Sequence, residues 1–110
     1  MEVIDTTKIW IISDTHDQIN LTKKAIDVFN KEKVDLVYHL GDWCSPFTCM
    51  IFSELNCELK SVFGNNDADI FKIIKNKPND VSFYDKFYVD EKEDLKICLF
   101  HDDPEEIVNA

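Results

Sequence analysis

The feature that most constrains the fold is an apolar run, KIWII at residues 8–12, that breaks abruptly into the polar segment SDTHD at residues 13–17. The apolar residues are continuous and do not alternate, which predicts a short strand buried on both faces. Asp14 and His16 are two positions apart, so an extended strand end would point both side chains the same way. A carboxylate oxygen and an imidazole nitrogen aimed at one point can hold a divalent metal ion.

The same sequence of an apolar strand and a polar break recurs along the chain. Apolar runs at residues 34–40, 57–63 and 95–100 are followed by Gly41-Asp42, by the segment GNND at residues 64–67, and by His101. A strand, a helix and a second strand in succession predict a parallel, right-handed unit. We therefore expect Asp42 to emerge at the same sheet edge as Asp14. The chain's only two glycines, Gly41 and Gly64, stand at two of these strand ends, where a positive φ or a close approach of the backbone to a ligand is expected.

Apolar residues at helical spacing predict three helices between the strands. Their expected starts are Asn20 or Thr22, Ser45-Pro46, and Asp67 or Asp69. Residues 81–89 and 95–100 are expected to form an antiparallel pair around a charged turn at residues 90–94. Together these elements predict an α/β domain with a mainly parallel core sheet and a C-terminal antiparallel hairpin.

Length and charge exclude several classes of protein. The 110 residues suffice for one domain with a modest core. A net charge of −10 disfavours general nucleic-acid binding and binding to anionic membranes. No apolar run is long enough to cross a bilayer, and nothing resembles a signal peptide. The four cysteines lack CxxC spacing and are expected to be reduced thiols. We therefore expect a cytoplasmic protein.

Each polar strand end also has an ordinary explanation as a turn, a helix cap or a surface histidine. Asp17 is expected to serve as a local turn or cap. For His39 there are two alternatives, a residue that supports the metal ligands from behind and a plain strand residue, and the second is favoured. An aspartate after the first strand also suits phosphoaspartate chemistry of the haloacid dehalogenase type, but that motif needs a second aspartate where this chain has His16. No Gly-rich phosphate loop is present. The joint placement of polar residues at successive strand ends favours a metal site.

In this order, the motifs resemble those of the calcineurin-like metallophosphoesterases, and more closely those of the small YfcE-type phosphodiesterases. The motifs are Asp14-x-His16, Gly41-Asp42, Gly64-Asn65-Asn66-Asp67 and His101. The resemblance implies a four-layer α/β/β/α sandwich with two divalent metal ions at the strand ends. It also implies that the first ion is held by Asp14 and His16, that both ions are bridged by Asp42, and that the second is held by Asn65 and His101.

The implied activity is hydrolysis of small phosphoesters, phosphodiesters above all, by a water activated between the two ions. Mn²⁺ is the first choice, and Ni²⁺, Fe²⁺ and Zn²⁺ also suit mixed nitrogen and oxygen ligands. Asn66 stands where many relatives carry a histidine that helps the leaving group. An amide can donate a hydrogen bond to a phosphate but cannot shuttle a proton, so substrates with good leaving groups are expected. Asp67 is expected to position the catalytic loop or a ligand.

The resemblance fails beyond His101. The family continues to a Gly-His-x-His motif that completes both metal shells, whereas this chain has no histidine after His101, and Asp102-Asp103 follow it. We expect a single domain over residues 1–110, truncated at its C-terminus, with an unpaired sheet edge. Three accounts stay open: an incomplete product of an active family, a chain completed by a second copy or by another chain, and a weak or inactive scaffold. Replacement of the missing ligands by Asp102 or Asp103 is a further hypothesis.

Overall fold

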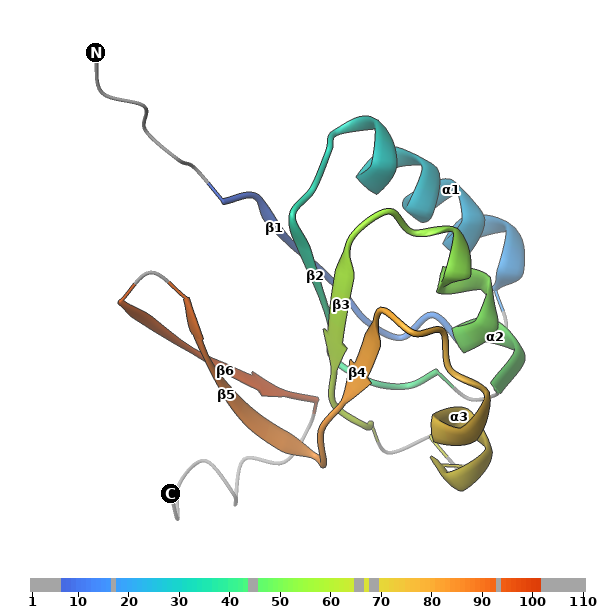
Figure 1. Ribbon diagram of the computed structural model, residues 1–110. Coiled ribbons are helices and arrows are strands. Elements are labelled where there is room, and N and C mark those ends of the chain that lie inside the picture. The colour runs from blue at the N-terminus through green and yellow to red at the C-terminus, as the bar shows by residue number, and fades with distance from the viewer. Residues whose placement is uncertain are drawn as a thin grey trace.

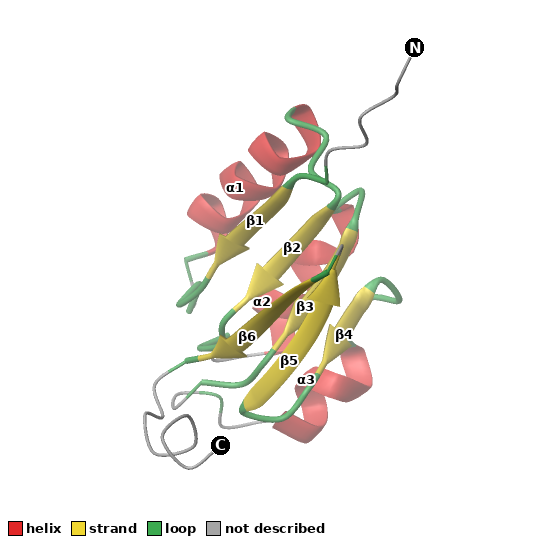
Figure 2. Ribbon diagram, turned by 90° about the vertical axis from the view of Figure 1, so that its left-hand side faces the viewer, coloured by secondary structure: helices red, strands yellow, loops and turns green. Residues whose placement is uncertain are grey.

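The computed structural model describes residues 7–16, 18–43, 46–64, 67, 70–92 and 94–101. These residues form a parallel sheet with helices on one face and an antiparallel hairpin on the other (Figures 1 and 2). The sheet has the order β1 (Ile9–Ile12), β2 (Leu36–His39), β3 (Glu58–Ser61) and β4 (Val81–Phe83). The helices are α1 (Ile19–Lys31), α2 (Pro46–Ile51), the 3₁₀ turn η1 (Phe52–Glu54) and α3 (Ile70–Asn76), and the hairpin joins β5 (Phe87–Lys92) to β6 (Leu95–Phe100).

This arrangement confirms the predicted α/β class, with a mainly parallel core sheet and a C-terminal hairpin. Helices, parallel sheet and hairpin make three stacked layers, as Figure 1 shows. The outer face of the hairpin is open in the described part of the chain: Val89 is 41% exposed and Phe100 is 37% exposed. The described residues therefore supply three layers of the predicted four-layer sandwich. Among the described helices, none combines the length and the apolar character that spanning a bilayer requires.

The single strand predicted over residues 81–89 is wrong, because two strands in different sheets divide this stretch. Val81 pairs in parallel with Leu59 of β3, and its side chain is buried in the core on the helix side. The chain then turns at Tyr84, whose ring stacks on Tyr88 with centroids 3.6 Å apart. From Phe87 onward the chain forms β5 and pairs antiparallel with β6. No glycine or proline stands between residues 81 and 89. The apolar pattern therefore gave no sign of the corner, and one continuous strand was predicted.

The prediction that the first strand is buried on both faces is also wrong. Ile12 and Trp10 pack into the core beneath the helices, but Ile11 on the opposite face is 64% exposed. The reason is the position of the hairpin, which packs against Leu36 and Tyr38 of β2 and leaves the outer part of β1 uncovered. β1 is thus an edge strand of the described sheet.

Helix α1 begins earlier than either predicted cap allows: Gln18 precedes its first residue, so Asn20 and Thr22 lie inside the helix. The hydroxyl of Thr22 donates to the carbonyl of Gln18 at 2.8 Å. The predicted start at Ser45-Pro46 is met by Pro46, the first residue of α2, while Ser45 lies outside the described residues.

A buried polar cluster joins the two sheets. Tyr38 of β2 donates its hydroxyl proton to Asp90 of β5 at 2.7 Å, and the Lys60 ammonium of β3 donates to both carboxylate oxygens at 3.0 and 3.1 Å. Asp90 is 4% exposed. Burial alone would raise the pKa of Asp90, but the hydrogen bonds from Tyr38 and Lys60 and the charge of Lys60 lower it below its ordinary value. This cluster fixes the hairpin over β2 and β3.

Replacing Lys60 with Met should therefore lower the free energy of unfolding by about 3 kcal/mol at neutral pH, because it leaves a buried carboxylate without its cation. The folded pKa of Asp90 is depressed, so its contribution is present above the ordinary value of 3.8 and is lost as the pH falls through the lower folded value. The deficit of the variant should shrink over that acidic range. Urea denaturation at several pH values measures both effects, with Lys86→Met as an exposed control; a neutral-pH deficit equal to that of the control would contradict the expectation.

Candidate metal centre

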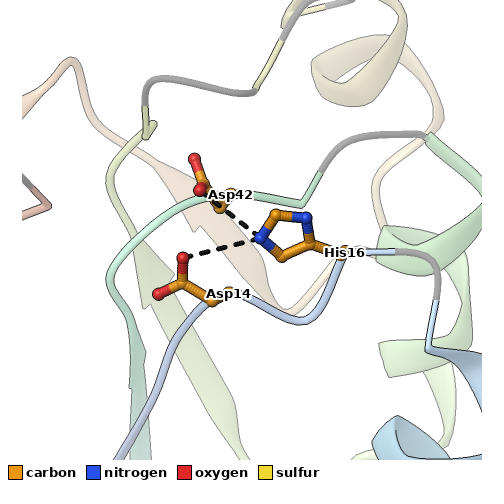
Figure 3. Close-up of side chains that lie close together, drawn as sticks. All are labelled: Asp14, His16 and Asp42. Carbon is orange, nitrogen blue, oxygen red and sulfur yellow. Dashed lines mark ion pairs between the residues drawn. The ribbon is translucent and has the colours of Figure 1, made fainter.

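The loops that follow β1 and β2 bring two carboxylates and an imidazole to one point (Figure 3). The Nε2 atom of His16 lies 3.6 Å from Oδ1 of Asp14 and 3.5 Å from Oδ2 of Asp42. One ligand atom from each of these three residues lies within 4.8 Å of the other two. Asp14 and His16 thus converge with Asp42, as the sequence predicts for polar residues at the carboxyl ends of parallel strands.

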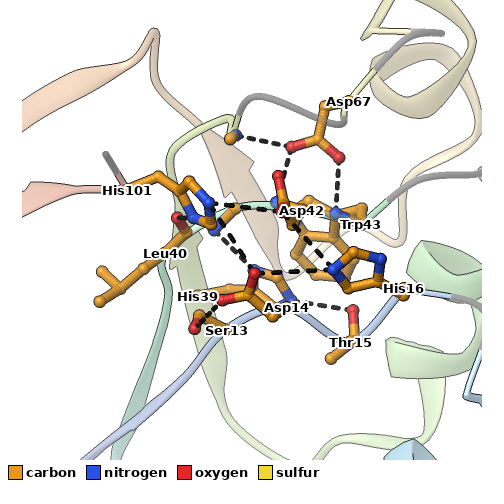
Figure 4. A network of polar contacts seen from close by, with 12 residues as sticks. Ser13, Asp14, Thr15, His16, His39, Leu40, Asp42, Trp43, Asp67 and His101 are labelled. Atoms are coloured by element: carbon orange, nitrogen blue, oxygen red, sulfur yellow. Dashed lines mark hydrogen bonds and ion pairs between the residues drawn. The ribbon is translucent and has the colours of Figure 1, made fainter. Parts of the chain in front are cut away.

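His101, which follows β6 of the hairpin, approaches the same carboxylates from the other side (Figure 4). Its Nε2 atom is 3.3 Å from Oδ2 of Asp42 and 3.8 Å from Oδ1 of Asp14. Its Nδ1 atom is 2.9 Å from the carbonyl oxygen of Leu40. Because a carbonyl oxygen only accepts, Nδ1 carries a proton, and in the neutral ring Nε2 presents its lone pair to the carboxylates. A second-nitrogen bond of this kind is typical of metal-ligating histidines.

The loop backbones adopt left-handed conformations, and the extended strand end expected at residues 14–16 is wrong. The φ angles are 54° at Asp14, 46° at His16 and 66° at Asp42. Each left-handed residue other than glycine costs roughly 1–2 kcal/mol. Two backbone hydrogen bonds offset part of this cost: Asp14 N–H donates to Gly41 O at 2.9 Å, and His16 N–H donates to Asp42 O at 3.0 Å.

Both glycines are needed where the loops meet. Gly41 has a φ of 102°, and a Cβ there would collide with the backbone of Gly64. A Cβ on Gly64 would collide with the carboxylate and the backbone nitrogen of Asp42. The predicted positive φ is confirmed at Gly41, and the close approach found at both positions is between the two loops themselves.

Asp67 binds the backbone beneath the cluster. Its carboxylate accepts hydrogen bonds from the N–H groups of Asp42 at 2.9 Å, of Gly64 at 2.7 Å, and of Trp43. The side chain is therefore turned toward these loops, three residues before the first residue of α3, Ile70. The contacts suit the predicted positioning role, while a part in catalysis stays a prediction.

Other predicted site residues lie outside the described residues. These are Asp17, Asn65, Asn66, Asp69, Asp102 and Asp103.

The contacts of His39 favour the alternative that the sequence analysis ranked second. His39 was expected to be a plain strand residue, but its ring is fully buried and is bonded to the loops on both sides: Gly41 N–H donates to Nδ1 at 3.0 Å, and Nε2 lies 3.1 Å from Oγ1 of Thr15. Burial lowers the pKa of His39 to about 3, so the ring is neutral. Its position three residues before Asp42 was the available signal, since that places it directly beneath the predicted ligand loop.

The donor set fits a divalent metal ion. Two carboxylates and two imidazoles are the mixed oxygen and nitrogen ligands that Mn²⁺, Fe²⁺, Ni²⁺ and Zn²⁺ accept. The contacts of His16 and His101 with the carboxylates are ion pairs only when the rings are protonated. A cation among them supplies the same compensating charge to neutral rings, which are the ligating form.

Strands that end in clustered carboxylates and imidazoles define an α/β protein with a candidate metal site. The profile of the calcineurin-like phosphoesterase superfamily domain matches residues 7–110. The chain belongs to this superfamily, which confirms the resemblance drawn from the sequence motifs.

Two relatives support the same assignment. The chain is 38% identical over 96 residues to phosphodiesterase MJ0936 of Methanocaldococcus jannaschii, covering 86% of this chain and 58% of that protein. It is similar to the solved structure of an archaeal phosphodiesterase, with a TM-score of 0.82 and 35% identity over 94% of this chain and 64% of the other. The chain thus spans less than two thirds of the length of either relative.

A more distant structure shares the fold. A protein of unknown function from Aquifex aeolicus, AQ665, matches with a TM-score of 0.60 and 25% identity, over 87% of this chain and 61% of the other.

Replacing Asp67 with Asn should lower the free energy of unfolding of the metal-free protein by about 2 kcal/mol, because the amide NH₂ group cannot accept from the buried backbone N–H groups that the carboxylate serves. Urea denaturation in the presence of a chelator measures the change. Asp85→Asn is the matched control, since Asp85 is exposed and its carboxylate accepts from the N–H group of the next residue at 2.9 Å. Equal stabilities of the two variants would contradict the structural role of Asp67.

Proposed function

We propose that this protein hydrolyses phosphoesters, phosphodiesters above all, in a metal-dependent reaction. The observation that carries the proposal is the gathering of Asp14, His16, Asp42 and His101 within ion-pair distances of one another. The superfamily match and the two phosphodiesterases to which the chain is similar favour the same activity.

The proposed centre holds two divalent ions, with Mn²⁺ as the first choice. Asp14 and His16 would hold one ion, and His101 with Asn65 would hold the other. Support for Asp42 as the shared ligand comes from its Oδ2 atom, which lies between two imidazoles, 3.5 Å from His16 Nε2 and 3.3 Å from His101 Nε2. When bound, such ions stabilise negative charge on a phosphoryl group and make water a better nucleophile at neutral pH.

The remaining roles belong to groups that orient these ligands and the substrate. The bond from His101 Nδ1 to Leu40 O holds the imidazole in the ligating tautomer. Asp67 holds the backbone of Asp42 through its own N–H group. For Asn66 we propose a hydrogen bond to a phosphate oxygen without proton transfer, which favours substrates with good leaving groups.

A second candidate function is that of a catalytically weak or inactive scaffold. The observation that favours it is the uncovered outer face of the hairpin, where Val89, Cys98 and Phe100 are exposed. A second copy of the chain or a complementing chain that covered this face would be the partner. An enzyme would bind metal and turn over substrate. A scaffold would form a stable complex with the partner chain and turn over no substrate.

The enzyme proposal predicts hydrolysis of an aryl phosphodiester in the presence of added Mn²⁺ and its loss when a chelator removes the metal. Asp42→Asn should lower the rate on the order of a hundredfold or more, because it removes the charged ligand shared by both halves of the centre. Asp27→Asn is the control, since it makes the same chemical change at an exposed position on α1. Release of aryl alcohol, followed by absorbance, measures both. Turnover that survives the chelator, or equal rates for the two variants, would refute the proposal.

A further inference from the structure

Thr15 and His39 lie directly behind the candidate ligands, facing away from the point where those ligands converge (Figure 4). Thr15 stands between Asp14 and His16 in the chain, yet it is only 6% exposed, while Asp14 is an exposed residue. His39 ends β2 and has no exposed surface. Thr15 therefore belongs to the loop of Asp14 and His16, and His39 is the strand residue that precedes the loop of Asp42.

Hydrogen bonding assigns the protons of the His39 ring. The N–H group of Gly41 donates to Nδ1 at 3.0 Å, so Nδ1 is the acceptor. The neutral ring then carries its proton on Nε2, which donates to the hydroxyl oxygen of Thr15 at 3.1 Å. The imidazole thus bridges the loop of Asp14 and His16 to the loop of Asp42.

The surroundings hold this ring in one orientation. The indole of Trp43 stacks on it, with centroids 3.7 Å apart and planes inclined by 14°. Phe52 meets it edge-on at 6.1 Å. Trp43 is itself anchored, because its Nε1–H group donates to Oγ of Ser61 at 2.9 Å. Rotation of the imidazole would break both hydrogen bonds in a site that water does not reach.

We propose that Thr15 and His39 are positioning residues for metal binding: their hydrogen bond sets the distance between the loop of Asp14 and His16 and the loop of Asp42. The inference rests on the proposed metal centre but not on its hydrolytic activity. Both loops need such a constraint, since Asp14, His16 and Asp42 all have left-handed backbones. Without this hydrogen bond the two loops can move apart, which lowers the affinity for the ion that both loops bind.

The test is the affinity for Mn²⁺ alone, measured by calorimetry on the metal-free protein. Thr15→Val keeps the shape of the side chain and removes the hydroxyl, and it should weaken Mn²⁺ binding about tenfold. The matched control is Thr22→Val. Thr22 is 3% exposed, and its hydroxyl donates to Gln18 O at 2.8 Å within α1. The control should bind Mn²⁺ within about twofold of the unmodified protein even where it loses similar stability.

A double-mutant cycle with His39→Asn isolates the bond itself. The asparagine oxygen can still accept from Gly41 N–H but cannot reach Thr15, so the double variant should bind Mn²⁺ no more weakly than the weaker single variant. Affinity losses that multiply, or Thr15→Val binding as tightly as Thr22→Val, would overturn the inference. At pH 7, ¹⁵N NMR of the imidazole should show the proton of His39 on Nε2, and a proton on Nδ1 would overturn it as well.

These outcomes separate the inference from the proposed function. Mn²⁺ binding that is weakened by Thr15→Val but accompanied by no hydrolysis would refute the activity alone. Hydrolysis with unchanged Mn²⁺ affinity in Thr15→Val would refute the positioning role alone. An unmodified protein that binds no Mn²⁺ would overturn both.

Discussion

The site depends on the pairing of two loops beyond the ends of their strands. Asp14 N–H donates to Gly41 O and His16 N–H donates to Asp42 O, so the contact between β1 and β2 continues after both strands have ended. These backbone hydrogen bonds therefore help to position each ligand on the two loops. The left-handed backbone at Asp14, His16 and Asp42 persists because these bonds hold both sides of the contact.

Layers on both faces of the parallel sheet contribute contacts to the edge where the candidate ligands lie. On the helix side, Trp43 and His39 pack beneath the loops, and Thr48 of α2 donates its hydroxyl proton to His16 O at 2.8 Å. On the other side, the hairpin delivers His101 from β6. Because Asp90 ties β5 to Tyr38 and Lys60, packing between the sheets decides how close that imidazole comes to Asp42. The hydrogen bonds of Asp90 and Thr48 therefore link the packing of the core to the positions of the candidate ligands.

Much of this could be predicted from the sequence, because parallel strands place their carboxyl ends at one edge. That rule predicted the meeting of Asp14, His16 and Asp42, whereas His101, which follows an antiparallel strand, was placed at the site by the family resemblance alone. It could not predict left-handed backbones at residues other than glycine, since those follow from loop pairing across the sheet. Nor could periodicity reveal the corner at Tyr84 or the exposure of Ile11, because both depend on where the hairpin packs. The position of His39 before Asp42 allowed a supporting role, but its partners Thr15 and Gly41 could not be predicted because they depend on how the loops pair.

The central claim is that these carboxylates and imidazoles together bind divalent ions at the ends of the strands. Anomalous diffraction from crystals equilibrated with Mn²⁺ tests it most directly. The account predicts one peak among Asp14, His16 and Asp42, and a second between Asp42 and His101. Mn²⁺ peaks confined to other surfaces of the protein, with none beside Asp42, would contradict it.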